Sequence, residues 1–174
     1  LLVADAASAT IWKYSRAGIG SVAARTGLLH PVDVDVDATG DLYVVDDTLG
    51  VVRVFKADGT FRDLATRATG LAETPRKLAI DRGGMVYVAG LLAGNTGVIQ
   101  RITTAGQVQA FATLGQFEVA RDLVVDAQGV VYATAGGGGQ GIERYSTAGV
   151  RTVIPTADVP YALAIDAGGG LHSV

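Results

Sequence analysis

Apolar and polar residues follow the same order several times along the chain, and most copies begin with a short strand pattern. In one of them the aliphatic residues Val34 and Val36 alternate with polar residues and lead into a turn from Asp37 to Gly40. Alternation at a period of two is typical of a strand that buries one face. Equivalent turns begin at Asp81, Asp126 and Asp166, at intervals of 44, 45 and 40 residues. The pattern therefore predicts a strand and a tight turn at the start of each of these copies.

Three further strands are predicted after such a turn. In the same copy they run from Leu42 to Val45, from Val51 to Phe55 and from Phe61 to Ala65. Aspartate at the first position of the turn accepts a bond from a backbone N–H two residues on, and glycine at the fourth tolerates positive φ. One repeat is thus four antiparallel strands in about 40 to 45 residues. We expect an all-β chain folded as a β-propeller of four-stranded antiparallel blades, with about four repeats present.

The repeats fill the chain and leave room for a single propeller domain. We place them at about residues 1–27, 28–71, 72–116 and 117–156, with a partial repeat at 157–174. Leu1 and Leu171 both align with Leu42, so the chain starts and stops inside equivalent second strands. We therefore expect an incomplete propeller or one closed by oligomerisation. An excerpt of a longer propeller is favoured over self-association through open blade faces, and a closed four-bladed ring is the third possibility.

The recurring order of residues resembles the NHL repeat. It runs from a proline through an aliphatic strand, Asp-x-x-Gly and apolar-Tyr-Val to Val-x-Arg-aromatic, as in the stretch from Pro31 to Phe55. The resemblance covers essentially the whole chain and implies kinship with the lactonase-like propellers, which usually have six blades. It also implies an extracytoplasmic or secreted location.

Composition narrows the range of partners. Hydrophobic residues make up 49% of the 174 residues, and 24 are glycine, which suits a packed, turn-rich β protein. The net charge of -3 gives no overall attraction to phosphate, so nucleic acid is not expected as a partner. No apolar run approaches the roughly 20 residues that span a bilayer, so membrane insertion is not expected. The expected partner is a protein or a small molecule.

Candidate ligand-binding residues occupy equivalent positions just before the first strands. Eight residues before the turn aspartate stand Glu73, Glu118 and Asp158, and five before it stand Arg76, Arg121 and Tyr161. Rotational symmetry gathers such positions near the mouth of a central channel. Two interpretations stay open: the ring holds a polar ligand or a cation, or its members are solvated loop residues. A divalent cation there is conceivable, but no motif supports it, so we assign neither a metal site nor a cofactor.

Other acidic residues also suggest chemistry at first sight. Asp33 and Asp35 alternate on one strand, as metal ligands can, and we expect them to face the channel. Asp46 and Asp47 stand at the end of the second strand and have Asp5 as a counterpart in the first copy, but the other copies have Gly90 and Ala135 there. Capping of the loop explains this aspartate pair better than catalysis does.

The remaining candidates point away from catalysis. His30 and His172 are the only histidines, and we expect both to be packed. The chain has no Gly-x-Ser-x-Gly motif for acyl transfer, and the glycine run at 136–139 is predicted to be a flexible rim loop. The lactonase-like families place a Glu, an Asn and an Asp around one ion, but Asn95 is the only asparagine and no motif matches this set.

Three functional hypotheses follow, and no catalytic residue is assigned. The leading hypothesis is a non-enzymatic NHL-like propeller that acts as a binding and recognition scaffold through one rim. The first alternative is a lactonase- or lyase-like enzyme with its site at the channel mouth. The second alternative is a self-assembling partial propeller.

Overall fold

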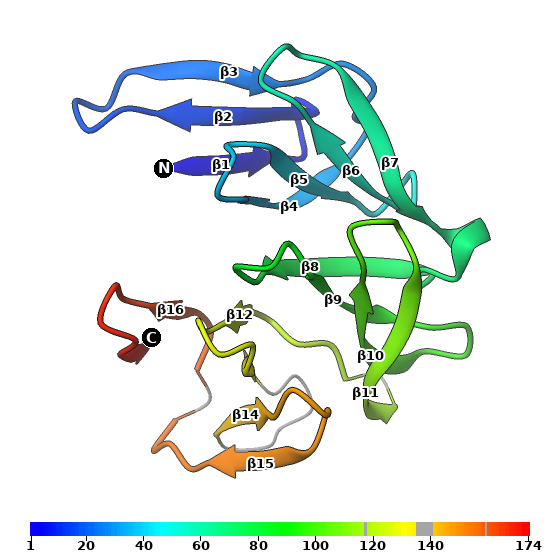
Figure 1. Cartoon of the computed structure of the whole chain (residues 1–174), viewed down its shortest axis with the longest axis vertical. Helices are drawn as coiled ribbons and strands as arrows, with labels where there is room; N and C mark the ends of the chain where they lie inside the picture. The colour runs from blue at the N-terminus through cyan, green and yellow to red at the C-terminus, as the bar shows by residue number, and fades with distance from the viewer. Residues whose placement is uncertain (117, 135–140, 159) are drawn as a thin grey trace.

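A computed structural model describes residues 1–116, 118–134, 141–158 and 160–174 (Figure 1). The glycine run at 136–139, predicted to be a rim loop, lies outside these ranges. The strands are β1 (Leu2–Asp5), β2 (Thr10–Tyr14), β3 (Gly20–Ala24), β4 (Pro31–Val36), β5 (Leu42–Asp46), β6 (Val51–Phe55), β7 (Phe61–Thr66), β8 (Thr74–Ile80), β9 (Val86–Leu91), β10 (Thr96–Ile102), β11 (Val108–Gln116), β12 (Leu123–Val125), β13 (Val131–Thr134), β14 (Ile142–Tyr145), β15 (Arg151–Ile154), β16 (Leu163–Ile165) and β17 (Leu171–Ser173). One 3-10 helix, η1 (Arg67–Thr69), follows β7. Within the described ranges no helix is long and apolar enough to cross a membrane.

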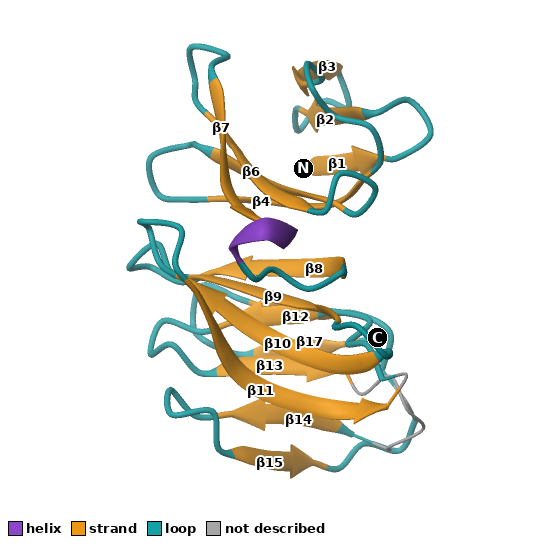
Figure 2. Ribbon diagram, turned by 90° about the vertical axis from the view of Figure 1, so that its right-hand side faces the viewer, coloured by secondary structure: helices purple, strands orange, loops and turns teal. Residues whose placement is uncertain are grey.

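The strands form five antiparallel sheets in chain order. Three sheets have four strands, β4–β7, β8–β11 and β12–β15, while β1–β3 and β16–β17 form smaller ones. The first strands β4, β8, β12 and β16 follow one another around the middle of the molecule, and the last strands lie at its outside (Figure 1). Figure 2 shows the molecule from the side, with the sheet β1–β3 near one end and β15 at the other. The predicted all-β architecture of four-stranded antiparallel sheets is therefore confirmed.

The sheet β4–β7 buries both of its faces, one against each neighbouring sheet. On one face, Val44 of β5 packs with Ile11 of β2. On the other face, Tyr43 and Val45 pack with Leu78 of β8. Because alternate residues of a strand point to opposite faces, a strand with two covered faces is apolar over successive residues, as β5 is from Leu42 to Val45. Each fully buried valine or leucine contributes about 1.5–3 kcal/mol, so contact between the sheets is a main source of stability.

Side-chain carboxylates also join the innermost strands of neighbouring sheets. An edge strand presents backbone N–H groups that lack a partner in the ladder, and an aspartate of the preceding sheet accepts bonds from them. Among the described residues, three such bonds are present, from Leu78 N to Asp33 at 2.9 Å, from Ile80 N to Asp35 at 3.1 Å and from Leu163 N to Asp122 at 2.7 Å. Asp33 and Asp35, which the sequence placed toward the channel, thus connect one inner strand to the next.

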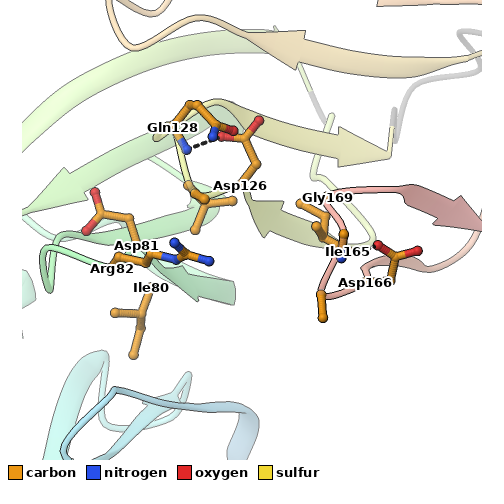
Figure 3. Close-up of a pocket in the computed structure, with 12 residues that line it drawn as sticks. Ile80, Asp81, Arg82, Asp126, Gln128, Ile165, Asp166 and Gly169 are labelled. Atoms are coloured by element: carbon orange, nitrogen blue, oxygen red, sulfur yellow. Dashed lines mark hydrogen bonds between the residues drawn. The ribbon is translucent and has the colours of Figure 1, made fainter.

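The Asp-x-x-Gly turns have the geometry that the sequence predicts. In each, the Oδ1 atom of the aspartate accepts a bond from the N–H two residues on, at Thr39, Gly83, Gln128 and Gly168. Three of these turns, those of Asp81, Asp126 and Asp166, surround a hollow of about 530 Å³ at one end of the inner strands (Figure 3). The carboxylates of these three aspartates accept hydrogen bonds within their own turns. They therefore serve to hold the turns at this end of the inner strands.

The expectation that both histidines are packed was wrong. The side chains of His30 and His172 are 48% and 65% exposed. His172 occupies the tyrosine position of a sheet that has only two strands, so no outer strands cover it. Its Nε2 lies 2.9 Å from Asp166 Oδ2, which is the contact that the Tyr132 hydroxyl makes with Asp126 at 3.2 Å. The imidazole therefore takes over the turn contact of the tyrosine without its packing.

The bond from Ile80 N to Asp35 allows a test of the contact between inner strands. Asp35→Ala removes the acceptor, whereas Asp35→Asn keeps one acceptor oxygen. At pH 7 we therefore expect the free energy of unfolding of Asp35→Ala to be about 1 kcal/mol lower than that of Asp35→Asn. Urea denaturation followed by circular dichroism measures the difference. Equal stability of the two variants would contradict a role for this bond.

The same aspartate predicts a pH dependence. Burial raises the pKa of Asp35 above its usual value, although the N–H groups of Val36 and Ile80 oppose the shift. The folded protein then binds this proton more tightly than the unfolded chain does, so the wild type loses stability relative to Asp35→Asn as the pH rises from about 4 through the folded pKa. Urea denaturation of both proteins between pH 3.5 and 7 gives their free energies of unfolding. A difference between the two proteins that stays constant over this range would contradict the prediction.

Candidate functional site

A second hollow, of about 540 Å³, lies at the end of the molecule where the inner strands begin. We call it the mouth hollow, and it is lined by Val32, Arg76, Lys77, Val119, Ala120, Arg121 and Tyr161. Four of these residues occupy one equivalent position, five residues before a turn aspartate. The structure therefore brings together three of the six residues that the sequence proposed for ligand binding, namely Arg76, Arg121 and Tyr161.

Irregular pairing explains how two of these side chains reach the mouth hollow. The register of β4 against β5 shifts between Pro31 and Asp33, and that of β8 against β9 shifts between Pro75 and Lys77. Each shift leaves one extra residue, Val32 or Arg76, outside the ladder. A β-bulge of this kind redirects the side chain of the extra residue, here toward the mouth hollow.

Three cationic side chains and one aromatic ring set the chemistry of the mouth hollow. Arg76 is half exposed, and the Arg121 guanidinium carbon lies 4.4 Å from the centroid of the Tyr161 ring. This cation–π contact orients Arg121. Lys77 Nζ lies 3.8 Å from the Asp33 carboxylate. Burial raises the pKa of Asp33, and the charge of Lys77 is the main effect that opposes the shift.

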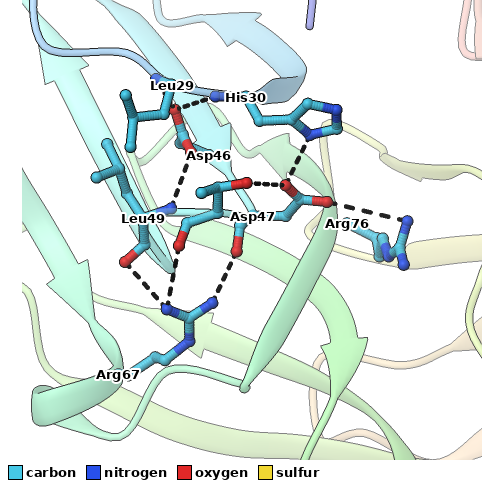
Figure 4. A network of polar contacts seen from close by, with 8 residues as sticks. Leu29, His30, Asp46, Asp47, Leu49, Arg67 and Arg76 are labelled. Atoms are coloured by element: carbon cyan, nitrogen blue, oxygen red, sulfur yellow. Dashed lines mark hydrogen bonds and ion pairs between the residues drawn. The ribbon is translucent and has the colours of Figure 1, made fainter.

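A buried carboxylate organises the loops beside the mouth hollow (Figure 4). Asp46 is fully buried. It accepts bonds from the backbone N–H groups of Leu29 at 2.7 Å, His30 at 2.9 Å and Leu49 at 3.0 Å. It thus fixes the chain before β4 and the loop after β5 to each other. The loop-capping role predicted for Asp46 is confirmed.

Asp47, the next residue, makes contacts of a different kind. Its Oδ1 lies 2.8 Å from His30 Nδ1, and its Oδ2 lies 4.0 Å from an Arg76 nitrogen. Its backbone carbonyl accepts a bond of 2.7 Å from Arg67. Two side chains from different parts of the chain therefore converge on this one carboxylate (Figure 4).

The three acidic residues proposed for the same ring lie elsewhere. Glu118 Oε2 accepts a bond from Gly115 N at 2.7 Å, so its side chain turns back onto its own loop. Glu73 is exposed and lies 3.8 Å from Arg67. Asp158 is exposed, and its backbone carbonyl accepts a bond from Thr156. None of the three carboxylates lines the mouth hollow.

The residues described do not fit a metal site of the kind that the lactonase-like resemblance implies. Among residues 1–116, 118–134, 141–158 and 160–174, no three His, Cys, Asp or Glu side chains are placed to hold one ion. Asn95 lies in a tight turn between β9 and β10 with φ of 63°. We therefore derive no chemistry through a bound metal.

Comparison with known proteins adds evidence on the fold. No protein-family model matches the sequence, and no curated protein matches it. Solved structures do match. A gluconolactonase from Xanthomonas campestris superposes on 99% of this chain with a TM-score of 0.78 and 16% identity, and a virginiamycin B lyase from Staphylococcus aureus superposes on 97% with a TM-score of 0.70 and 17% identity. The fold of this chain is therefore like that of these β-propeller proteins.

The same comparisons set limits of length and likeness. This chain spans 64% of the gluconolactonase and 57% of the lyase. An extracellular domain from B. thetaiotaomicron matches 95% of this chain with a TM-score of 0.66 and 11% identity. At these identities the likeness shows the fold, and the assignment to NHL repeats stays a prediction.

Sequence reasoning did not single out the contact between His30 and Asp47. Neither residue recurs in the other copies, so the repeat pattern gave no signal for them. The available signal was position, because His30 lies in the chain before a first strand and Asp47 in the loop after a second strand. In a propeller these two kinds of loop meet at one rim.

Asp46 should be the polar side chain of this rim on which stability depends most. Asp46→Ala leaves three partly buried backbone N–H groups without their acceptor, so we expect a loss of about 3 kcal/mol in the free energy of unfolding. Asp47→Asn, a change at a more exposed neighbour, is the control and should cost less than about 1 kcal/mol. Urea denaturation at pH 7 measures both, and similar losses for the two would contradict this role.

Proposed function

We propose that this chain is a binding module that holds a small organic anion in the mouth hollow. The observation that carries the proposal is the meeting of three cationic side chains, Arg76, Lys77 and Arg121, around one hollow with Tyr161. A chain with a net charge of -3 gathers positive charge here. Local charge of one sign in a concave site attracts ligands of the opposite sign.

The chemistry of the lining favours a carboxylate attached to an apolar or ring-shaped body. A guanidinium group binds a carboxylate through two parallel hydrogen bonds. The Tyr161 side chain is 69% exposed and offers a flat face beside Arg121, while Val32 supplies apolar surface. A volume of about 540 Å³ lies in the range of small-molecule sites.

Nearby carboxylates already have partners within the protein. Asp33 accepts the Leu78 N–H and Asp47 contacts His30. Their negative charge is partly compensated by these contacts, which supports an anion as the ligand of the mouth hollow. We also propose that the repeats are NHL repeats and that the protein has an extracytoplasmic location.

An enzymatic function is the second candidate, because the structural neighbours include a gluconolactonase and a virginiamycin B lyase. Incubation of the purified chain with gluconolactone and with a streptogramin B tests it. Turnover above the buffer rate that falls in an Arg121→Gln variant supports an enzyme. No turnover of either compound counts against these two activities for this chain.

Loss of one arginine of the mouth hollow should weaken anion binding. We expect Arg121→Gln to lower the affinity for the best ligand of a panel of small carboxylates by about tenfold, because one charge-assisted hydrogen-bonding group is lost. Isothermal titration calorimetry at low ionic strength measures this. Arg82→Gln, at the opposite end of the inner strands, is the matched control and should bind as the wild type does. Equal losses in both variants would indicate non-specific attraction and contradict the proposed site.

A further inference from the structure

We propose that anion binding in the mouth hollow is coupled to protonation of His30, through the Asp47 carboxylate that His30 and Arg76 share. The inference rests on the proposed function and adds to it: the ligand of this site binds more tightly when His30 carries a proton. His30 and Asp47 thereby become residues that set the charge of the site without lining it.

The geometry carries this coupling. Asp47 Oδ1 is 2.8 Å from His30 Nδ1, and Asp47 Oδ2 is 4.0 Å from an Arg76 nitrogen. Arg76 itself lines the mouth hollow. His30, on the chain before β4, and Arg76, on β8, thus approach the two oxygens of one carboxylate (Figure 4).

Both partners of the imidazole contact are held in place by their backbones. The His30 N–H donates to the buried Asp46 carboxylate at 2.9 Å. The Asp47 carbonyl accepts a bond of 2.7 Å from Arg67, whose guanidinium also donates to the carbonyls of Thr48 and Leu49. Such anchoring holds the two backbone segments from which the His30 and Asp47 side chains meet.

The other charged groups near this pair already have partners. Asp46 accepts three backbone N–H groups. Glu73 lies 3.8 Å from Arg67, and Lys77 pairs with Asp33 at 3.8 Å. Histidine is the side chain whose charge ordinarily changes between pH 5 and 8, and His30 is the histidine that contacts Asp47.

The direction of the coupling follows from simple electrostatics. An ionised carboxylate can only accept a hydrogen bond, so the neutral His30 ring carries its hydrogen on Nδ1 and donates a hydrogen bond to Asp47. When the ring is protonated, the second proton binds at Nε2. With His30 neutral, Asp47 offsets part of the Arg76 charge. With His30 protonated, the imidazolium balances Asp47, and the charge of Arg76 becomes available to a ligand. A proton and an anion therefore favour each other's binding.

Sulfate is a suitable probe because its charge is constant between pH 5.5 and 8.0. We expect wild-type protein to bind sulfate about fivefold more tightly at pH 5.5 than at pH 8.0 at low ionic strength, measured by calorimetry. By reciprocity, saturating sulfate should move the midpoint of the His30 imidazole titration, followed by NMR, to higher pH. His172 is the internal control, because it contacts Asp166 at the opposite end of the inner strands, and its midpoint should stay unchanged.

Matched variants separate this coupling from a general effect of pH. His30→Gln and Asp47→Asn should each reduce the pH dependence of sulfate affinity to less than twofold, whereas His172→Gln should keep it. A further readout needs no ligand. Arg76→Gln removes a positive charge beside Asp47, so the His30 titration midpoint should move to higher pH in that variant.

Two results would overturn the inference, and they differ in what else they overturn. Sulfate binding with the same affinity at both pH values, or a His30 titration that Arg76→Gln does not move, refutes the coupling and leaves the anion site standing. Absence of sulfate and carboxylate binding at both pH values refutes the proposed function and the coupling together.

Discussion

Burial of two faces of each sheet is the constraint on which the structure depends. A sheet such as β4–β7 cannot leave either side in water, because Val44 on one face and Val45 on the other both need apolar neighbours. Successive sheets therefore stack around a common centre, and their innermost strands come to lie next to one another. The edges of those strands are then linked by aspartates, as between Asp33 and Leu78. Apolar contact brings the sheets together, and the carboxylates fix the position of each inner strand relative to the next.

This stacking also determines where a site can form. All inner strands begin at one end of the molecule, so residues at one repeat position meet there although they are about 40 to 45 residues apart in sequence. At the opposite end the same symmetry gathers the Asp-x-x-Gly turns, whose carboxylates are occupied by their own backbones. One end is thus committed to turn structure, and the other presents side chains that no turn requires.

Features that recur in every repeat were predictable from the sequence, whereas contacts that occur in one copy were not. The alternation of Val34 and Val36 and the recurring turns were sufficient for strands, sheets and the meeting of Arg76 with Arg121 and Tyr161. Side-chain direction was not predictable, because Glu118 shares its repeat position with other acids and yet turns back to Gly115 N. Neither His30 nor Asp47 recurs in the other copies, so the repeat pattern gives no sign of their contact. The exposure of His172 follows from the absence of outer strands in its two-stranded sheet, a consequence that the partial repeat at residues 157–174 already implied.

The bulges of β4 and β8 have a consequence for how such a scaffold changes over time. Val32 and Arg76 stand outside the ladder, and the same position holds arginine and tyrosine in the next two copies. An exposed residue that takes no part in sheet pairing, as Arg76 is, can be exchanged at little cost to folding. Recognition can therefore diverge blade by blade on an unchanged framework, and a protein engineer can diversify the positions of Arg76, Arg121 and Tyr161.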